Sequence, residues 1–212
     1  MALPVPPPRA APEGGPARQD STGRAGGAGC AGRDLARWYE EGLGWPTAAG
    51  PPVALLTGVR FDALELPADA GAALLRRIGP TGPVALHGDR MRLLVAVGGA
   101  DELPGLLDWL EWGGITLGLT ALGAGGRMTA PVPPRWGAAT AQGAAVWLRP
   151  PVPGRERESA LPAFVPFGQR GGSGGGAPDL VRLVGAAALE CHRARLLRRN
   201  TFRTNTQPLA FS

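Results

Sequence analysis

The stretch that decides the fold is Leu55–Ala70, LLTGVRFDALELPADA. Its apolar residues predict a buried strand over Val59–Leu66. A helix is predicted to follow directly, from Ala68 to Ile78, because apolar residues recur there at helical spacing. Gly79 and Pro80 then end that helix. A strand running straight into a helix is a usual place for acidic residues that hold metal.

Two carboxylates, Asp62 and Glu65, lie on this predicted strand. Side chains on a strand alternate between its two faces, so residues three apart point in opposite directions. Asp62 and Glu65 therefore cannot both ligate one Mg²⁺ unless a bulge intervenes. They are the candidate catalytic residues of the chain, but we predict no metal site from them.

Further elements are predicted on both sides of this stretch. Two strands around Gly88-Asp89-Arg90 have the composition of a hairpin. A second hairpin is expected from Ile115–Leu122 and Arg127–Ala130, with the turn at Gly123 to Gly126. The remaining predictions are helices over Asp34–Gly44, Asp101–Trp112 and Pro178–Arg199, and strands over Val53–Leu56, Pro83–His87, Met91–Val97 and Val146–Leu148.

This order of elements predicts an α/β (α+β) protein with a largely antiparallel sheet flanked by helices. We expect a disordered Pro/Gly-rich tail at 1–32, one domain at 33–150, a linker at 151–177, and a C-terminal helix with a basic tail at 178–212. The last helix is expected to bury one stripe of residues: Leu180, Leu183, Val184, Ala187 and Cys191.

The 212-residue chain has a net charge of +5, and its 22 basic residues are all arginine. Together with 34 Gly and 23 Pro, this composition is typical of a high-GC bacterial genome. The charge is uneven, since residues 38–149 carry eight Arg and ten acids whereas 190–212 carry five Arg and one acid. A basic end on a nearly neutral core is weak support for contact with nucleic acid, and a solvated arginine-rich end is the more common reading of such a charge run.

The sequence also argues against several classes of protein. Its two cysteines, Cys30 and Cys191, form no CxxC pair, so a structural zinc site or a disulfide framework is not indicated. Cys191 and His192 are neighbours on a helix and point about 100° apart, which is unsuitable for a nucleophile and its base. Proline interrupts the N-terminus and no apolar run is long enough to span a membrane, so we expect a cytoplasmic protein without a membrane partner.

Four phrases, in this order, carry a family resemblance. They are Gly44-Trp45-Pro46, Leu56-Thr57-Gly58 before the strand, the Gly88 hairpin, and the run from Gly125 to Pro131, GGRMTAP. Over roughly residues 35–134 the chain resembles the N-terminal domain of bifunctional DNA primase/polymerases (Prim-Pol), in the archaeo-eukaryotic primase superfamily. The resemblance implies that fold and metal-dependent, template-directed nucleotidyl transfer.

The resemblance also implies a set of active-site residues, from which this chain departs. The family presents Asp-x-Asp on the strand, a His in the following hairpin, and a third acid before the Gly-Gly turn. Glu65 matches the first acid, but the second falls on Pro67, the His on about Met91, and the third acid near Thr120 or Ala121. Two-metal phosphoryl transfer needs several converging carboxylates, so the resemblance implies a relative that has lost polymerase chemistry.

The hypothesis from sequence is therefore a Prim-Pol-like protein that binds nucleotides, single-stranded DNA or a partner such as a replication protein, with no cofactor. His87, Arg90, Arg92 and Arg127 are the candidate phosphate-binding residues; Arg90 and Arg92 share a strand face.

Two alternatives stay open. One is an active primase/polymerase that uses Mg²⁺ or Mn²⁺ held by acids such as Asp62 and Asp89. The other is a structural interaction protein that docks through its Arg-rich C-terminal helix and has no nucleic-acid role.

Overall fold

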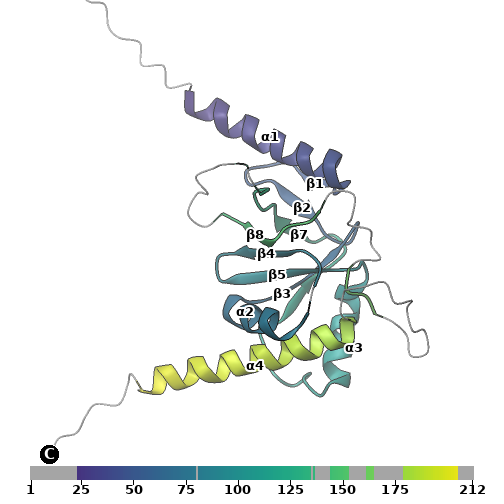
Figure 1. Cartoon of the computed structure of the whole chain (residues 1–212), viewed down its shortest axis with the longest axis vertical. Coiled ribbons are helices and arrows are strands. Elements are labelled where there is room, and N and C mark those ends of the chain that lie inside the picture. The colour runs from purple at the N-terminus through teal and green to yellow at the C-terminus, as the bar shows by residue number, and fades with distance from the viewer. Residues whose placement is uncertain are drawn as a thin grey trace, which may run out of the picture.

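A computed structural model describes residues 23–79, 81–134, 136, 144–152, 161–164 and 179–204, with side chains described from residue 31 to residue 200. This part of the chain is an α+β fold with four helices and two antiparallel sheets (Figure 1). The elements are α1 Gly23–Leu43, β1 Thr47–Ala48, β2 Ala54–Leu56, β3 Asp62–Pro67, α2 Ala68–Arg77, β4 Val84–His87, β5 Arg90–Val95, α3 Gly99–Trp109, β6 Thr120–Leu122, β7 Arg127–Thr129, β8 Val146–Arg149 and α4 Leu180–Thr204.

The larger sheet has the strand order β6-β3-β5-β4-β8, and the smaller sheet has the order β1-β2-β7. Helices α2, α3 and α4 cover one face of the larger sheet, while α1 and the smaller sheet lie on the other side (Figure 1). The interior strand β3 is therefore packed on both faces, which explains its high apolar content.

Each face of β3 contributes to a different apolar cluster. Leu64 and Leu66 point toward the three helices, and Phe61 and Ala63 point toward α1 and the smaller sheet. All four side chains are at most 1% exposed. The two-residue alternation predicted from sequence thus places one strand in two cores at once.

The C-terminal helix α4 belongs to the cluster on the helical side. The stripe predicted for this helix is confirmed, because Leu180, Leu183, Val184, Ala187 and Cys191 are each at most 1% exposed within that cluster. Helices α2 and α4 run antiparallel, since Arg77 bonds Glu190 at one end and Asp69 bonds Arg198 at the other.

Part of the predicted linker also packs onto the domain. Leu161 is 6% exposed, Ala96 donates its N–H to the Pro162 carbonyl at 2.9 Å, and Leu180 donates to the Ala163 carbonyl at 3.1 Å. This segment therefore connects the sheet directly to the first turn of α4. The rest of the expected linker lies outside the described residues, apart from Pro151 and Val152.

The predicted starts of two elements were wrong. Helix α1 begins at Gly23 rather than at Asp34, and it takes in residues 23–32 of the expected tail, a stretch without proline. Strand β3 begins at Asp62 rather than at Val59, because Gly58 donates to the Phe61 carbonyl and closes a turn. Residues 1–22 of the expected tail lie outside the described residues.

The predicted hairpin over 115–130 was also wrong. Only Thr120–Leu122 of its first half is a strand, and this strand, β6, pairs with β3. Strand β7 pairs with β2 in the other sheet. The chain therefore crosses between the sheets at Gly123–Gly126, where Gly126 donates to the Gly123 carbonyl at 3.0 Å.

A second turn packs against this crossover. Thr57 donates its hydroxyl to the Gly123 carbonyl at 2.6 Å, and its N–H to the Gly126 carbonyl at 3.1 Å. Gly58, at φ +80°, lies so close that an added Cβ would come within 2.2 Å of the Cα of Ala124. Glycine is therefore required here both for its backbone conformation and for the space.

We predict that Gly58→Ala destabilises the fold by roughly 2–4 kcal/mol, from backbone strain together with the clash. The matched control is Gly105→Ala in α3, where an added Cβ meets nothing within 4 Å. That change should stabilise the protein by about 0.5–1 kcal/mol, because alanine favours a helix interior. Urea denaturation of both variants checks this, and similar changes in the two would contradict the close approach.

Tyr39 links three segments of the chain through hydrogen bonds of its hydroxyl group. Its hydroxyl donates to the Pro131 carbonyl at 2.6 Å and accepts from the indole Nε1 of Trp147 at 2.8 Å. The ring is fully buried, and this burial raises the pKa of Tyr39. The residue thereby links α1 to the segment after β7 and to β8.

We predict that Tyr39→Phe lowers the free energy of unfolding by about 1–3 kcal/mol, because it leaves a buried carbonyl without its donor and an indole N–H without its acceptor. Thr116→Val, which removes a hydroxyl from an exposed residue, is the control and should change stability by less than about 0.5 kcal/mol. Equal effects in the two denaturation curves would show that the Tyr39 bonds contribute nothing.

Candidate functional site

The candidate site lies on the face of the larger sheet that points away from α2, α3 and α4. Strand register forms a row of residues across this face. Glu65 pairs with Arg92 on one side and with Thr120 on the other, and Ala85 pairs with Arg92 and with Trp147. Directly opposite residues share a face, so all five side chains lie on the same side of the sheet.

A second row lies next to it, at the end of the β4–β5 hairpin. Here Arg90 pairs with Pro67 on β3 and with His87 on β4. Gly88 and Asp89 form the two-residue turn, with Gly88 at φ +59°. The predicted hairpin is confirmed, and it brings His87, Arg90 and Arg92 to one face.

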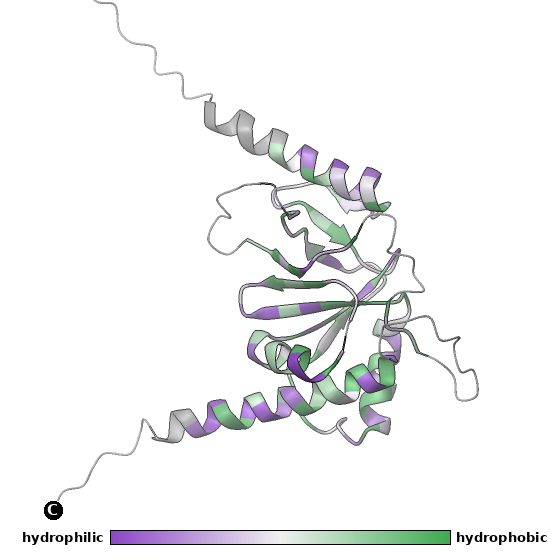
Figure 2. Cartoon of the chain, in the orientation of Figure 1, coloured by the Kyte–Doolittle hydropathy of each residue, from purple (hydrophilic) through white to green (hydrophobic). Residues whose placement is uncertain are grey.

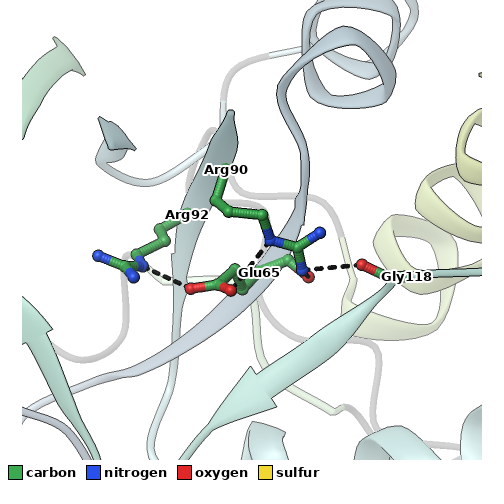
Figure 3. A network of polar contacts seen from close by, with 4 residues as sticks. All are labelled: Glu65, Arg90, Arg92 and Gly118. Atoms are coloured by element: carbon green, nitrogen blue, oxygen red, sulfur yellow. Dashed lines mark hydrogen bonds and ion pairs between the residues drawn. The ribbon is translucent and has the colours of Figure 1, made fainter. Parts of the chain in front are cut away.

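One carboxylate at the centre of this face is shared by two guanidinium groups (Figure 3). Arg92 donates from Nε to Oε2 of Glu65 at 2.7 Å, and Arg90 donates from Nε to Oε1 at 3.0 Å. Nη2 of Arg90 also donates to the Gly118 carbonyl at 2.8 Å and to that of Glu65 at 3.2 Å. The three side chains are only 13–26% exposed, so water screens the contacts incompletely.

The two arginines determine the charge state of Glu65. Burial by itself raises the pKa of this carboxyl, but the hydrogen bonds from Arg92 and Arg90 outweigh burial and hold the pKa below its usual value. Glu65 is therefore ionised at neutral pH and carries one negative charge between two positive ones. Nη1 of Arg92 is buried and has no hydrogen-bond partner among the described residues.

Asp62 lies on the opposite face, as the alternation of side chains predicted. It is 1% exposed, and its Oδ2 accepts from the N–H groups of Gly98 and Ala100 at 2.9 and 3.0 Å. These N–H groups open α3, so Asp62 caps that helix from a neighbouring strand. Its role is thus to fix α3 on the sheet, and it takes no part in the face that carries Glu65.

The acids proposed for an active enzyme do not converge. Asp62 lies at the start of β3, and Asp89 lies beside its far end, where its carbonyl accepts from the N–H of Ala68. The five residue steps of β3 separate these ends by about 17 Å at roughly 3.3 Å per residue. Among the described residues, no group of three or more His, Cys, Asp or Glu side chains is placed to hold a metal ion.

The remaining sequence candidates are not in this face. Arg127 is exposed on β7, in the smaller sheet. Met91, the position matched to the family histidine, is 2% exposed and faces the helices beneath Gly71. Burial raises the pKa of the Cys191 thiol to about 11, so this cysteine is a core residue.

Sequence reasoning missed the pairing of Glu65 with the two arginines, and it missed Trp147 as part of the row. The hairpin signal was enough to place His87 opposite Arg90. No local signal says which strand lies beside β5, so the partner of Arg92 could not be inferred.

A shallow depression of about 420 Å³ lies elsewhere, on the outer side of α1, lined by Asp34, Arg37, Trp38, Glu41 and Gly42. Arg37 and Glu41 are an exposed helical ion pair at 2.8 Å, one turn apart. Such pairs are ordinary on helix surfaces. We therefore place the candidate site at Glu65 and not here.

Comparison of the chain with protein-family models, curated proteins and solved structures finds no match. What the protein does must therefore be inferred from its residues and their geometry. A search of the described helices finds none that combines the length and the apolar character needed to cross a membrane.

We predict that Glu65→Gln lowers stability at pH 7 by roughly 1–2 kcal/mol, because a neutral amide bonds the two arginines less strongly. The folded pKa of Glu65 is depressed, so its contribution is fully present above the unfolded value near 4.5 and declines as the pH falls below it. Denaturation curves from pH 7 to pH 3 should therefore show wild type and variant converging.

The control places the same substitution in an Arg92→Gln background. There the pH-dependent difference should shrink, because the main donor to Glu65 is gone. A difference that persists unchanged would show that Arg92 does not set the pKa of Glu65.

Proposed function

We propose that this chain is a Prim-Pol-like protein without nucleotidyl-transfer activity, which binds the phosphate groups of a nucleotide or of single-stranded DNA. The binding surface is the sheet face with Glu65, Arg90, Arg92 and His87. The single observation that carries the proposal is the Glu65 carboxylate held between two guanidinium groups, at 2.7 and 3.0 Å.

The sign of the charge on this face argues against metal-dependent transfer. The Prim-Pol resemblance puts three acids at Glu65, at Pro67 and near Thr120 or Ala121. Pro67 and Thr120 share the face of Glu65, whereas Ala121 pairs with Leu64 on the other face. Of the three, only Glu65 is a carboxylate, and both of its oxygens already accept hydrogen bonds from arginine. Two cations about 3.5–4 Å apart require several free carboxylates, and a second positive guanidinium would repel them.

The same arrangement favours an anionic ligand. The two guanidinium groups and one carboxylate leave one net positive charge, and His87 lies beside Arg90. Arginine presents several donors in a planar fork that suits phosphate oxygens. Since Nη1 of Arg92 has no partner among the described residues, a phosphate oxygen there would satisfy a buried donor.

Glu65 acts in this proposal as an internal competitor for the ligand. Its carboxylate occupies the place between the two arginines that a phosphate would otherwise take. Removing its charge should therefore strengthen anion binding, whereas removing an arginine should weaken it. If Glu65 instead held a catalytic metal ion, removing its charge would weaken metal binding and lower activity.

We predict that dATP and a labelled oligothymidylate bind without added metal and that Glu65→Gln binds them about five- to tenfold tighter. Arg92→Gln should weaken binding about tenfold or more, a loss of about 1.4 kcal/mol or greater. Arg182→Gln, an exposed position on α4, is the control of equal charge and should bind as wild type does. Fluorescence anisotropy and titration calorimetry measure these affinities.

Primer extension with Mg²⁺ or Mn²⁺ tests the alternative of an active enzyme. Extension by the wild type that is lost in Glu65→Ala would overturn the proposal. Absence of binding to either probe in wild type and in Glu65→Gln would also overturn it, and would favour a structural interaction role.

A further inference from the structure

Six arginines lie on the two antiparallel helices α2 and α4, and we call this set the α2–α4 arginine surface. Its members are Arg76, Arg77, Arg193, Arg195, Arg198 and Arg199. All are exposed except Arg195, which is partly buried. Hydrophilic residues recur along α4 between apolar ones (Figure 2), and the C-terminal end of α4 reaches past α2 (Figure 1).

The carboxylates beside this surface neutralise it only in part. Glu190 accepts from both Arg77 and Arg193 at 3.0 Å, and Asp69 pairs with Arg198. Six guanidinium groups against two carboxylates leave four uncompensated positive charges among these residues. A positive excess of this size on two rigid helices attracts a polyanion.

The neighbouring helix has the opposite charge. Asp101, Glu102, Asp108 and Glu111 are exposed on or directly after α3, and residues 99–112 contain no arginine. Positive and negative residues on this side of the molecule are therefore separated into two regions. A polyanion is attracted to α2 and α4 and repelled from α3, which orients it on the surface.

The shape and composition of the surface indicate which polyanion fits. Proteins that hold single strands stack bases on aromatic rings, and residues 68–77 and 180–200 contain no Phe, Trp or Tyr. A duplex needs only phosphate contacts, and it offers one charge per about 1.7 Å of axis. From Arg193 to Arg199 the helix rises about 9 Å, so its guanidinium groups reach several phosphates.

A membrane surface and a second copy of the chain fit less well. Leu196 and Leu197 are 45% and 67% exposed, but the rest of the apolar stripe of α4 is already buried in the core. Two leucines do not make the continuous apolar face that an interfacial helix needs. We propose that the α2–α4 arginine surface binds the phosphate backbone of double-stranded nucleic acid without reading its sequence.

This surface lies on the helical side of the sheet, so its test is separate from that of Glu65, Arg90 and Arg92. The test variant is Arg76→Gln/Arg199→Gln, two exposed positions that form no ion pair with a described residue. The control is Arg37→Gln/Arg127→Gln, which removes the same charge from exposed positions on α1 and β7. A fluorescein-labelled DNA duplex is titrated at several salt concentrations.

The test variant should bind the duplex about tenfold or more weakly than wild type, and its log–log salt slope should fall by about 1.8, since each lost phosphate contact removes about 0.9. The control should bind the duplex within about twofold of wild type. Equal affinities of test and control variants would overturn the proposal. So would the absence of duplex binding at low salt, or light scattering that shows self-association dependent on Arg76 and Arg199.

Discussion

A strand inside a sheet sends adjacent side chains to opposite faces, and in this protein the interior strand β3 is packed on both faces. This constraint determines on which face of the sheet each of its two carboxylates lies. Asp62 faces the helices and accepts N–H groups at the start of α3, while Glu65 faces the other way and meets two arginines. Both oxygens of Glu65 and Oδ2 of Asp62 accept hydrogen bonds from fixed groups of the protein, whereas Oδ1 of Asp62 is buried without a partner among the described residues. The two side chains are separated by the sheet itself.

The electrostatic character of the candidate site follows from that separation. A carboxylate in the row formed by β6, β3 and β5 has no second acid near it, because the neighbouring positions are Thr120 and Arg92. Strand pairing brings these positions together whatever residues occupy them. The fold therefore fixes the positions, and the side chains determine which kind of ligand they can bind. A face with this geometry serves cation chemistry when its residues are acidic and anion binding when they are basic.

Local patterns predicted the parts of the structure that depend on local forces. The stripe on α4, the helix after β3 and the Gly88-Asp89 turn follow from helical spacing and from glycine's freedom at positive φ. The division of β6 and β7 between two sheets did not follow, because two short strands around a glycine turn look like a hairpin in sequence. The ion pairs of Glu65 join residues 25 and 27 positions apart, and only the order of strands determines them.

The place of α4 in the core has a consequence for where this chain can be divided. Strand β5 and helix α2 pack against apolar residues that are contributed from beyond residue 179, in the same cluster as Leu74 and Leu93. A recombinant piece that ends near residue 150 would leave this cluster open to water and prone to aggregate. Conversely, a peptide that spans α4 and is supplied in trans can cover this apolar cluster. The shortened domain and the helix are therefore suited to fragment complementation.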